Sequence, residues 1–335
     1  MNEEEIKRII TLNYNLDIKS IEKVKNTYKV NAKEGMYCVK VIKYQFPHFY
    51  FILSAILHLQ QRGFDKIPTI LKTKGDEYYI ELLGRFAYLT EWIPSRESNY
   101  DNPIELDLVA QKLGELHECS KGFTITDSMK PRIGWFSWLK VFNTRKDEML
   151  DFKHRISQKA HKSDFDKIYL ENIESEVNRA EQSVRELSKL NYYELMEKEM
   201  FKRGFCHHDY ANHNVLIDNK GEINIIDFDY CILDTHIHDL SSLLIRAMKN
   251  GKWDKNKAER IINNYCKTSG LIKEELPLMK EFIRFPQGFW QLGIQMYWEQ
   301  QPWEEKFFIE RLQKYLNDRE EREQFVESFF LKGGG

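Results

Sequence analysis

Residues 204–231 read GFCHHDYANHNVLIDNKGEINIIDFDYC, and this stretch decides the fold. Two short apolar runs inside it, at 214–218 and 222–228, flank a turn at Asn219-Lys220-Gly221. This composition predicts a β-hairpin. Because a hairpin brings its two ends together, we expect the polar side chains just before its first strand and at the end of its second strand to converge.

The polar side chains at the ends of this hairpin have a characteristic spacing. Asp209 stands two residues after a histidine, Asn214 follows Asp209 by five residues, and Asp227 lies beyond the hairpin. The catalytic loop of phosphoryl-transfer enzymes has this spacing. Such chemistry needs charge neutralisation and an acceptor hydroxyl aimed in line, and Mg²⁺ binds one or two carboxylates. We therefore predict that Asp209 is the base or orienting group, and that Asn214, Asp227 and Asp229 hold metal.

A metal cage is a second interpretation of the same region. Half of the ten histidines lie in or near it: His207, His208, His213, His236 and His238. Such side chains can bind Zn²⁺ or Fe²⁺, and Asp and Asn near hairpins are also common turn formers. However, adjacent histidines in an extended segment point to opposite sides, and neither belongs to an HExxH pair. We favour the phosphate site, with His207 expected to brace the catalytic loop.

The first 93 residues have a strand-like pattern. The runs IKSIEKV, TYKVNAK, MYCVKVIK, YYIELL and FAYLTEWI predict strands, and one helical pattern over 47–62 interrupts them. In MYCVKVIK the alternation puts Lys40 on the same side as apolar residues. We predict that Lys40 holds nucleotide phosphates. In LTEWIPS, Glu91 and Ile93 are predicted to offer backbone hydrogen bonds to adenine.

The break in the chain falls at residues 94–103, PSRESNYDNP, which are the most linker-like stretch. Helical patterns such as 104–120 and 165–198 dominate after it. The sequence therefore predicts an α+β, two-lobed protein kinase-like fold. Its parts are a small antiparallel-sheet nucleotide-binding lobe with one helix at 1–93, a hinge at 94–103, and a larger, mostly helical lobe at 104–335 with the catalytic loop and metal site.

Composition limits the kinds of partner. The 335 residues are 42% hydrophobic, which is enough for two cores, and 50 Lys and Arg nearly balance 52 Asp and Glu. This balance predicts neither nucleic acid nor membrane as a partner. There is no basic signal peptide and no apolar run of about 18 residues, so we expect a soluble, unexported protein. The five cysteines include no CxxC pair and are expected to be reduced.

These residues also carry a family resemblance. The segments CHHDYANHN, IIDFDYCILDTHIHDL, LGELH and FPQGFWQLG resemble the CotS-type spore coat proteins of the aminoglycoside phosphotransferase and choline kinase superfamily. The likeness covers most of the chain. It implies a two-lobed kinase-like fold and association with the spore coat. We accordingly expect ATP and Mg²⁺ as cofactors, synthesis in the mother-cell cytoplasm before location in the coat, and other coat proteins as partners. The resemblance supplies no substrate.

The acceptor is predicted to be a small molecule. Protein kinases have a long activation segment after the metal-binding aspartate. Here Asp239, the expected N-cap of the apolar helix LSSLLIRAM, follows Asp227 by only twelve residues. A small hydroxyl or amine acceptor is therefore favoured. The C-terminal aromatic residues could form a cage for a quaternary amine, although at helical spacing they are more typical of a core.

Two features depart from an active kinase. The turn between the first strands, VKNTYKV, has no GxGxxG motif. The helical pattern over 47–62 contains no Glu or Asp, so the usual lysine–glutamate ion pair cannot form from its centre. His48, Gln60 and Gln61 are the candidate substitutes. These departures support an alternative function, a weak or inactive pseudokinase that is a structural component of the coat.

Overall fold

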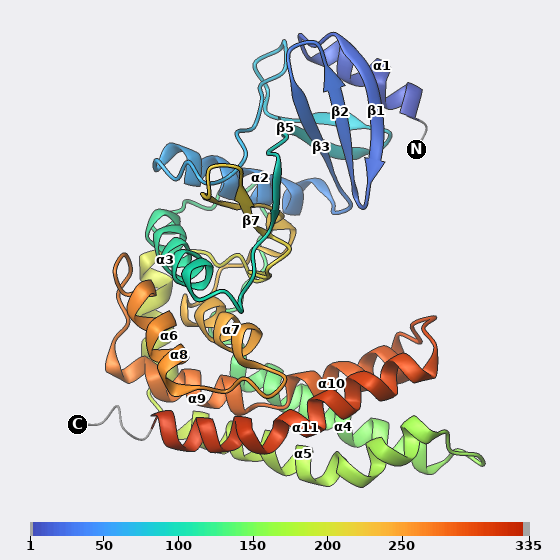
Figure 1. Cartoon of the computed structure of the whole chain (residues 1–335), viewed down its shortest axis with the longest axis vertical. Coiled ribbons are helices and arrows are strands. Elements are labelled where there is room, and N and C mark those ends of the chain that lie inside the picture. Colours follow the sequence, from blue (N-terminus) through green and yellow to red (C-terminus); the bar gives the residue numbers. More distant parts are fainter. Residues whose placement is uncertain (1–2, 331–335) are drawn as a thin grey trace. The chain divides into compact units, whose positions relative to one another are not determined.

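The computed structural model describes residues 3–330, which form two compact units (Figure 1). Residues up to 133 together with 202–233 make the first unit, and residues 134–201 together with those from 234 onward make the second. Every residue predicted for nucleotide binding, metal binding or catalysis lies in the first unit. These two units are not the two lobes that the sequence predicts, and the predicted lobe boundaries at 94–103 stay a prediction.

A five-stranded antiparallel sheet forms the core of the first unit. Its strands are paired in the order β1-β2-β3-β5-β4 and are β1 (Ile18–Val24), β2 (Thr27–Ala32), β3 (Met36–Ile42), β4 (Ile80–Leu82) and β5 (Arg85–Glu91). Ile6 and Ile10 from helix α1 (Glu3–Asn13) share one buried apolar cluster with Val39 and Val41 of β3. Because side chains alternate along a strand, Lys40 points to the opposite face.

Helix α2 (Phe46–Gln61) confirms the helix predicted over 47–62. Pro47 lies in its first turn, where its missing N–H costs nothing, and the apolar residues at three- and four-residue spacing are buried. The expected α+β class is confirmed by this sheet and helix in the first unit and by the helices of the second.

The hairpin predicted from the quoted stretch is also confirmed. It consists of β7 (Val215–Asp218) and β8 (Ile223–Ile225). The Asp218 carboxylate accepts hydrogen bonds from the amides of Lys220 (2.8 Å) and Glu222 (3.0 Å), which fixes the turn. The stretch predicted as a hinge contributes β6 (Ser95–Glu97), which pairs with β7 and leads into α3 (Pro103–Ser120).

The second unit is helical. Its main helices are α4 (Trp138–Ser157), α5 (Asp164–Lys189), α6 (Tyr192–Lys202), α7 (Ile237–Met248), α8 (Lys255–Tyr265), α9 (Leu276–Arg284), α10 (Gln287–Gly293) and α11 (Glu305–Phe330). Within residues 3–330, no helix has the length and apolar character needed to cross a membrane. No disulfide joins the five cysteines, all of which lie in this range.

Two helical regions differ in detail from the expectations. The helical pattern over 165–198 forms helices as predicted, but it is divided into α5 and α6, because Leu190 is extended and the Leu195 amide bonds back to the carbonyl of Asn191. Asparagine competes with the helical backbone and favours such helix starts. Asp239 was predicted as the N-cap of α7, but the helix begins at Ile237 and Asp239 lies in its first turn. A carboxylate there still favours the positive end of the helix dipole.

His236, next to the start of α7, is buried between two carboxylates of the second unit. Its Nδ1 lies 2.9 Å from Glu199 Oε2 and its Nε2 lies 3.5 Å from Glu275 Oε2. Each ring nitrogen therefore faces a different carboxylate, an arrangement that suits an imidazolium with two N–H donors. Burial lowers the pKa of His236, but the Glu199 carboxylate, which is hydrogen-bonded to Nδ1, and the nearby Glu275 carboxylate outweigh that effect and raise the pKa to about 9.

This histidine makes stability depend on pH. Because its pKa is higher in the folded protein than in the unfolded chain, its contribution is complete below about pH 6.5 and is lost as the pH rises through about 9. The shift corresponds to about 3 kcal/mol of unfolding free energy. Urea unfolding between about pH 6 and pH 10 measures it. His236→Gln is expected to flatten the profile, and an unchanged slope in that variant would contradict the assignment.

Candidate functional site

The catalytic loop lies directly before β7. Asp209 is partly buried, and its carboxylate Oδ2 accepts a hydrogen bond from Asn214 Nδ2 at 3.0 Å. The same Nδ2 donates to the Asp209 carbonyl oxygen at 2.9 Å. Because the amide nitrogen of Asn214 is turned toward Asp209, its carbonyl oxygen Oδ1 is the atom able to ligate a cation.

His207 braces this loop, as predicted. The backbone amide of Asp209 donates to His207 Nδ1 at 3.3 Å, so Nε2 carries the ring proton and donates to the Ile226 carbonyl oxygen at 2.9 Å. One imidazole thus connects the segment before β7 to the segment after β8. It fixes the backbone of Asp209 relative to the residue that precedes Asp227.

Asp227 and Asp229 converge on Lys40. The Lys40 Nζ lies 2.9 Å from Asp227 Oδ1 and 3.1 Å from Asp229 Oδ2. Asp227 has left-handed backbone (φ 67°, ψ 67°) and is followed by a single 3₁₀ turn at Phe228–Tyr230. A non-glycine residue in this region is uncommon and often marks a functional site. The structure therefore brings together residues 187 positions apart in the sequence.

Electrostatic attraction stabilises the cluster of Lys40, Asp227 and Asp229. Lys40 is only 8% exposed. Burial lowers its pKa, but Asp229 and then Asp227 outweigh burial, so that the pKa of Lys40 is raised. Burial raises the pKa of both carboxyl groups; beside Lys40 the pKa of Asp227 falls below its usual value, whereas that of Asp229 stays above it. The pair thus holds one firmly ionised carboxylate and one that gains a proton more readily.

A pocket of about 620 Å³ opens beside this cluster within the first unit. Four cationic side chains line it, against the two carboxylates of Asp227 and Asp229: Lys23, Lys40, Lys43 and Arg85. Tyr44 and Tyr230 also contribute to its wall. The sequence did not single out Lys23, Lys43, Tyr44, Arg85 or Tyr230. Each comes from a strand end or turn, where a lysine or arginine is ordinarily a solvated surface residue.

Arg132 supports the wall of the pocket. Its Nη2 donates to the Tyr44 hydroxyl at 2.7 Å, and its guanidinium lies 5.1 and 5.2 Å from the ring centroids of Tyr44 and Tyr230. Its Nη1 also approaches the Asp229 carbonyl oxygen at 3.5 Å. Arg132 therefore connects the residue after Asp229 to the segment after β3. Nothing in the sequence around Arg132 signals this role.

The predicted adenine-binding residues lie elsewhere. Glu91 ends β5, opposite Tyr37, and the Ile93 carbonyl oxygen accepts a hydrogen bond from the Ser95 hydroxyl at 2.9 Å. Neither Glu91 nor Ile93 is among the described residues that line the pocket. The pocket therefore does not include the residues predicted to contact adenine, and those contacts stay a prediction.

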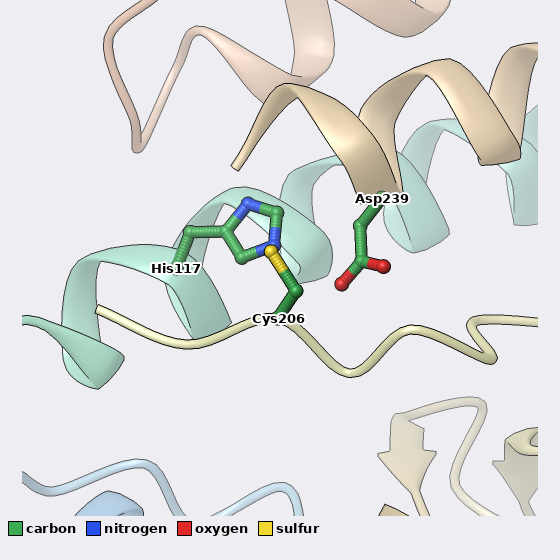
Figure 2. A group of neighbouring side chains, drawn as sticks. All are labelled: His117, Cys206 and Asp239. Carbon is green, nitrogen blue, oxygen red and sulfur yellow. The ribbon is translucent and has the colours of Figure 1, made fainter. Parts of the chain in front are cut away.

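The histidine cage does not form from the quoted stretch. Among residues 3–330, His207, His208 and His213 belong to neither of the two groups of three clustered ligand side chains. His213 Nε2 instead lies 3.8 Å from Asp209 Oδ2, and His208 has left-handed backbone. Figure 2 draws the side chains of one of these groups, which are His117, Cys206 and Asp239.

The C-terminal aromatic residues pack mainly as a core rather than as an open cage. Phe289 stacks on Tyr169 and Phe285 on Phe142, each with ring centroids 4.0 Å apart. The Trp290 ring already carries the Arg145 guanidinium, 4.4 Å from its centroid. A protein cation therefore occupies a ring that an amine ligand would need.

The side chains of Asn214, Asp227 and Asp229 have the chemistry of magnesium ligands, and the pocket beside the two carboxylates suits nucleotide phosphates. Carboxylate oxygens and an amide oxygen are the hard ligands that Mg²⁺ prefers. Asp229 Oδ1 is buried and has no hydrogen-bond partner among the described residues, so the single ammonium of Lys40 leaves the negative charge of Asp227 and Asp229 only partly compensated. The cationic pocket beside it matches the charge of a polyphosphate.

The chain is similar in sequence to one curated spore coat protein and in fold to several phosphotransferases. It shares 22% identity over 312 residues with spore coat protein S of Bacillus subtilis (strain 168), and the aligned region covers 92% of this chain and 88% of that protein. An aminoglycoside phosphotransferase from Alicyclobacillus acidocaldarius subsp. acidocaldarius DSM 446 superposes with a TM-score of 0.84 at 20% identity, over 97% of this chain and 96% of the other. A spectinomycin phosphotransferase in complex with ADP and spectinomycin gives 0.74 at 16%, over 98% of both chains.

These likenesses confirm the predicted kinase-like fold and the predicted resemblance. The family model described as “Spore coat putative kinase YutH” matches residues 7–329, nearly the whole chain. This chain therefore belongs to the YutH family of kinase-like spore coat proteins.

Proposed function

We propose that this protein is an ATP- and Mg²⁺-dependent phosphotransferase that acts on a small-molecule hydroxyl or amine acceptor. One observation carries the proposal: the buried ammonium of Lys40 lies within 3.1 Å of two carboxylates from the loop after the hairpin, Asp227 and Asp229. Few structural needs bring a buried strand lysine to two adjacent loop carboxylates. Binding of a metal and a polyphosphate is one of them.

Each predicted site residue has a role in this proposal. Asn214 and Asp227 hold Mg²⁺, with Asp229 as the further ligand expected from the sequence. Bound magnesium would neutralise phosphate charge. Lys40 binds the α- and β-phosphates, and the other pocket cations attract the polyphosphate. Figure 1 shows β3, which carries Lys40, and β7, which follows the catalytic loop.

Asp209 acts on the acceptor. Its carboxylate is held by Asn214 and its backbone by His207. In this position it orients the acceptor hydroxyl or amine and accepts its proton as the new bond to the γ-phosphorus of ATP forms and the bond from that phosphorus to the β-phosphate oxygen breaks, which releases ADP. The proton therefore moves to an Asp209 carboxylate oxygen.

The two predicted lobes have different roles in this proposal. Residues 1–93 would bind the nucleotide, with backbone hydrogen bonds from Glu91 and Ile93 to adenine, and 104–335 would carry the catalytic loop. The ADP complex of the spectinomycin phosphotransferase supports this choice of nucleotide. Family membership supports a place in the spore coat after synthesis in the mother cell, with other coat proteins as partners.

A pseudokinase is the second candidate function. Helix α2 carries no acidic residue, so the ion pair that usually positions the strand lysine cannot come from it. In this alternative the chain binds nucleotide with little or no turnover, or is inert, and serves as a structural component of the coat. Transfer chemistry would then be absent even where the fold is intact.

Phosphorus NMR of the native chain with MgATP and a panel of small alcohols and amines separates the two candidates. A new phosphoester or phosphoramidate resonance, together with ADP, is the expected result. ATP that stays intact with every acceptor, in a protein whose coat assembly tolerates Asp209→Asn, would favour the pseudokinase.

A further inference from the structure

The helix that would normally position the phosphate-binding lysine has no group for that task. Helix α2 reads FPHFYFILSAILHLQQ. His48 Nδ1 lies 3.0 Å from the Lys130 carbonyl oxygen, and Gln60 Nε2 donates to the Pro68 carbonyl oxygen at 3.0 Å. Gln61 is exposed. His48 Nδ1 and Gln60 Nε2 therefore contact carbonyl oxygens, Gln61 faces solvent, and the two ion pairs of Lys40 are with Asp227 and Asp229.

Lys40 nevertheless has a second carboxylate. Asp227 is the aspartate whose place after the hairpin matches the metal-binding residue of phosphoryl-transfer enzymes. Asp229 lies one residue further into the 3₁₀ turn, with its Oδ2 3.1 Å from Lys40 Nζ. If Asp227 gives its charge to a cation, Asp229 is the carboxylate that still faces the ammonium.

The loop that carries Asp229 is fastened to the strand that carries Lys40. Arg132 donates to the Tyr44 hydroxyl, two residues after β3, and its guanidinium also lies over the Tyr230 ring. Tyr230 follows Asp229 directly. This connection limits how far the Asp229 carboxylate can move from Lys40. A helix would limit the movement of a glutamate carboxylate in the same way.

We propose that Asp229 replaces the missing helix carboxylate and positions the Lys40 ammonium for the nucleotide phosphates, rather than serving mainly as a magnesium ligand. Asp229 is thus a positioning residue that acts through Lys40, while Asp227 serves the metal. This inference rests on the proposed nucleotide site and changes the assignment of one of its residues.

A double-mutant cycle tests the proposal through MgATP affinity, measured by calorimetry on the whole chain. Asp229→Asn is expected to weaken MgATP binding at least about tenfold, because one partner of a buried charge pair is lost. In the Lys40→Met background the same substitution is expected to change the affinity by less than about twofold. A magnesium ligand would behave differently, since its loss would weaken binding in both backgrounds.

Magnesium dependence gives a second readout that a purely structural role would not move. Asp227→Asn is expected to raise the Mg²⁺ concentration needed for half-maximal ATP binding about tenfold or more. Asp229→Asn should leave that concentration within about twofold of the native value. Asp76→Asn is the matched control, because Asp76 is an exposed aspartate of the same unit that pairs with Lys72.

Asp229→Glu keeps the test possible if the asparagine variant does not fold. It retains the charge but displaces the carboxylate by one methylene, so an intermediate loss of affinity is expected in the native background and none with Lys40→Met. Equal losses in both backgrounds, or a magnesium requirement raised as in Asp227→Asn, would overturn the proposal alone. Failure of the native chain to bind MgATP would overturn the proposed function with it.

Discussion

Asp209→Asn is expected to lower kcat for phosphoryl transfer by about 10²- to 10⁴-fold, the usual contribution of a positioned base. Asparagine has the shape of aspartate but cannot take the acceptor's proton. The substitution also keeps an oxygen that can accept the hydrogen bond from Asn214, and the His207 contact is to backbone. The binding of MgATP should therefore change little, so the loss appears in kcat rather than in the KM for ATP.

Steady-state kinetics with one phosphorylated acceptor measures both constants. Asp65→Asn is a suitable control, because Asp65 is an exposed aspartate of the same unit that pairs with Lys66. A kcat that falls less than about tenfold in Asp209→Asn would mean that Asp209 is not the base or orienting group. Equal loss in the Asp65 variant would point to a general effect of charge.

Arg284→Met is expected to lower the free energy of unfolding by about 3–5 kcal/mol, the usual effect of breaking a buried ion pair from one side. Arg284, at the end of α9, is buried. Its Nη1 lies 2.9 Å from Glu281 Oε1, its Nε lies 3.2 Å from Glu323 Oε1, and its Nη2 contacts Glu327. One guanidinium therefore joins α9 to α11, and its loss leaves the buried Glu281 without that cation.

The surroundings of the Glu281 carboxyl group explain why Arg284→Met is expected to lower stability. Burial already raises the pKa of Glu281 to about 7 with the arginine present. Urea unfolding near neutral pH measures the loss, and Arg185→Met is the control, because Arg185 is an exposed arginine of the same unit beside Glu186. The double variant Glu281→Gln with Arg284→Met should recover part of the stability. A loss below about 1 kcal/mol in Arg284→Met would show that the network does not hold the two helices.

Local patterns predicted the parts of the fold and site that lie close together in sequence. The hairpin, its turn and the spacing of Asp209, Asn214 and Asp227 all follow from one stretch of 28 residues. Strand alternation also put Lys40 on the side away from Val39 and Val41, which the structure packs in one cluster with Ile6 and Ile10 of α1. In these cases the determining contacts are short-range, so periodicity and turn composition are enough.

Other features depend on contacts between distant segments, which periodicity does not encode. Arg132 gains its role only because the chain brings it beside Tyr44 and Tyr230. The pocket cations other than Lys40 lie at or next to the ends of three different strands, β1, β3 and β5. The sequence showed that α2 lacks an acid, but only the structure shows that Asp229 is the carboxylate next to Lys40. The helical pattern over 165–198 did not reveal the interruption at Leu190–Asn191, which divides it into α5 and α6.

Calorimetric titration of the native chain and of Asp227→Asn with ATP, each with and without Mg²⁺, tests the central claim most directly. The account predicts binding that needs magnesium in the native chain and is abolished by the substitution. Asp227 would then be the residue through which the metal reaches the nucleotide. Absence of ATP binding under every condition, or binding that is indifferent to both magnesium and Asp227, would contradict the account.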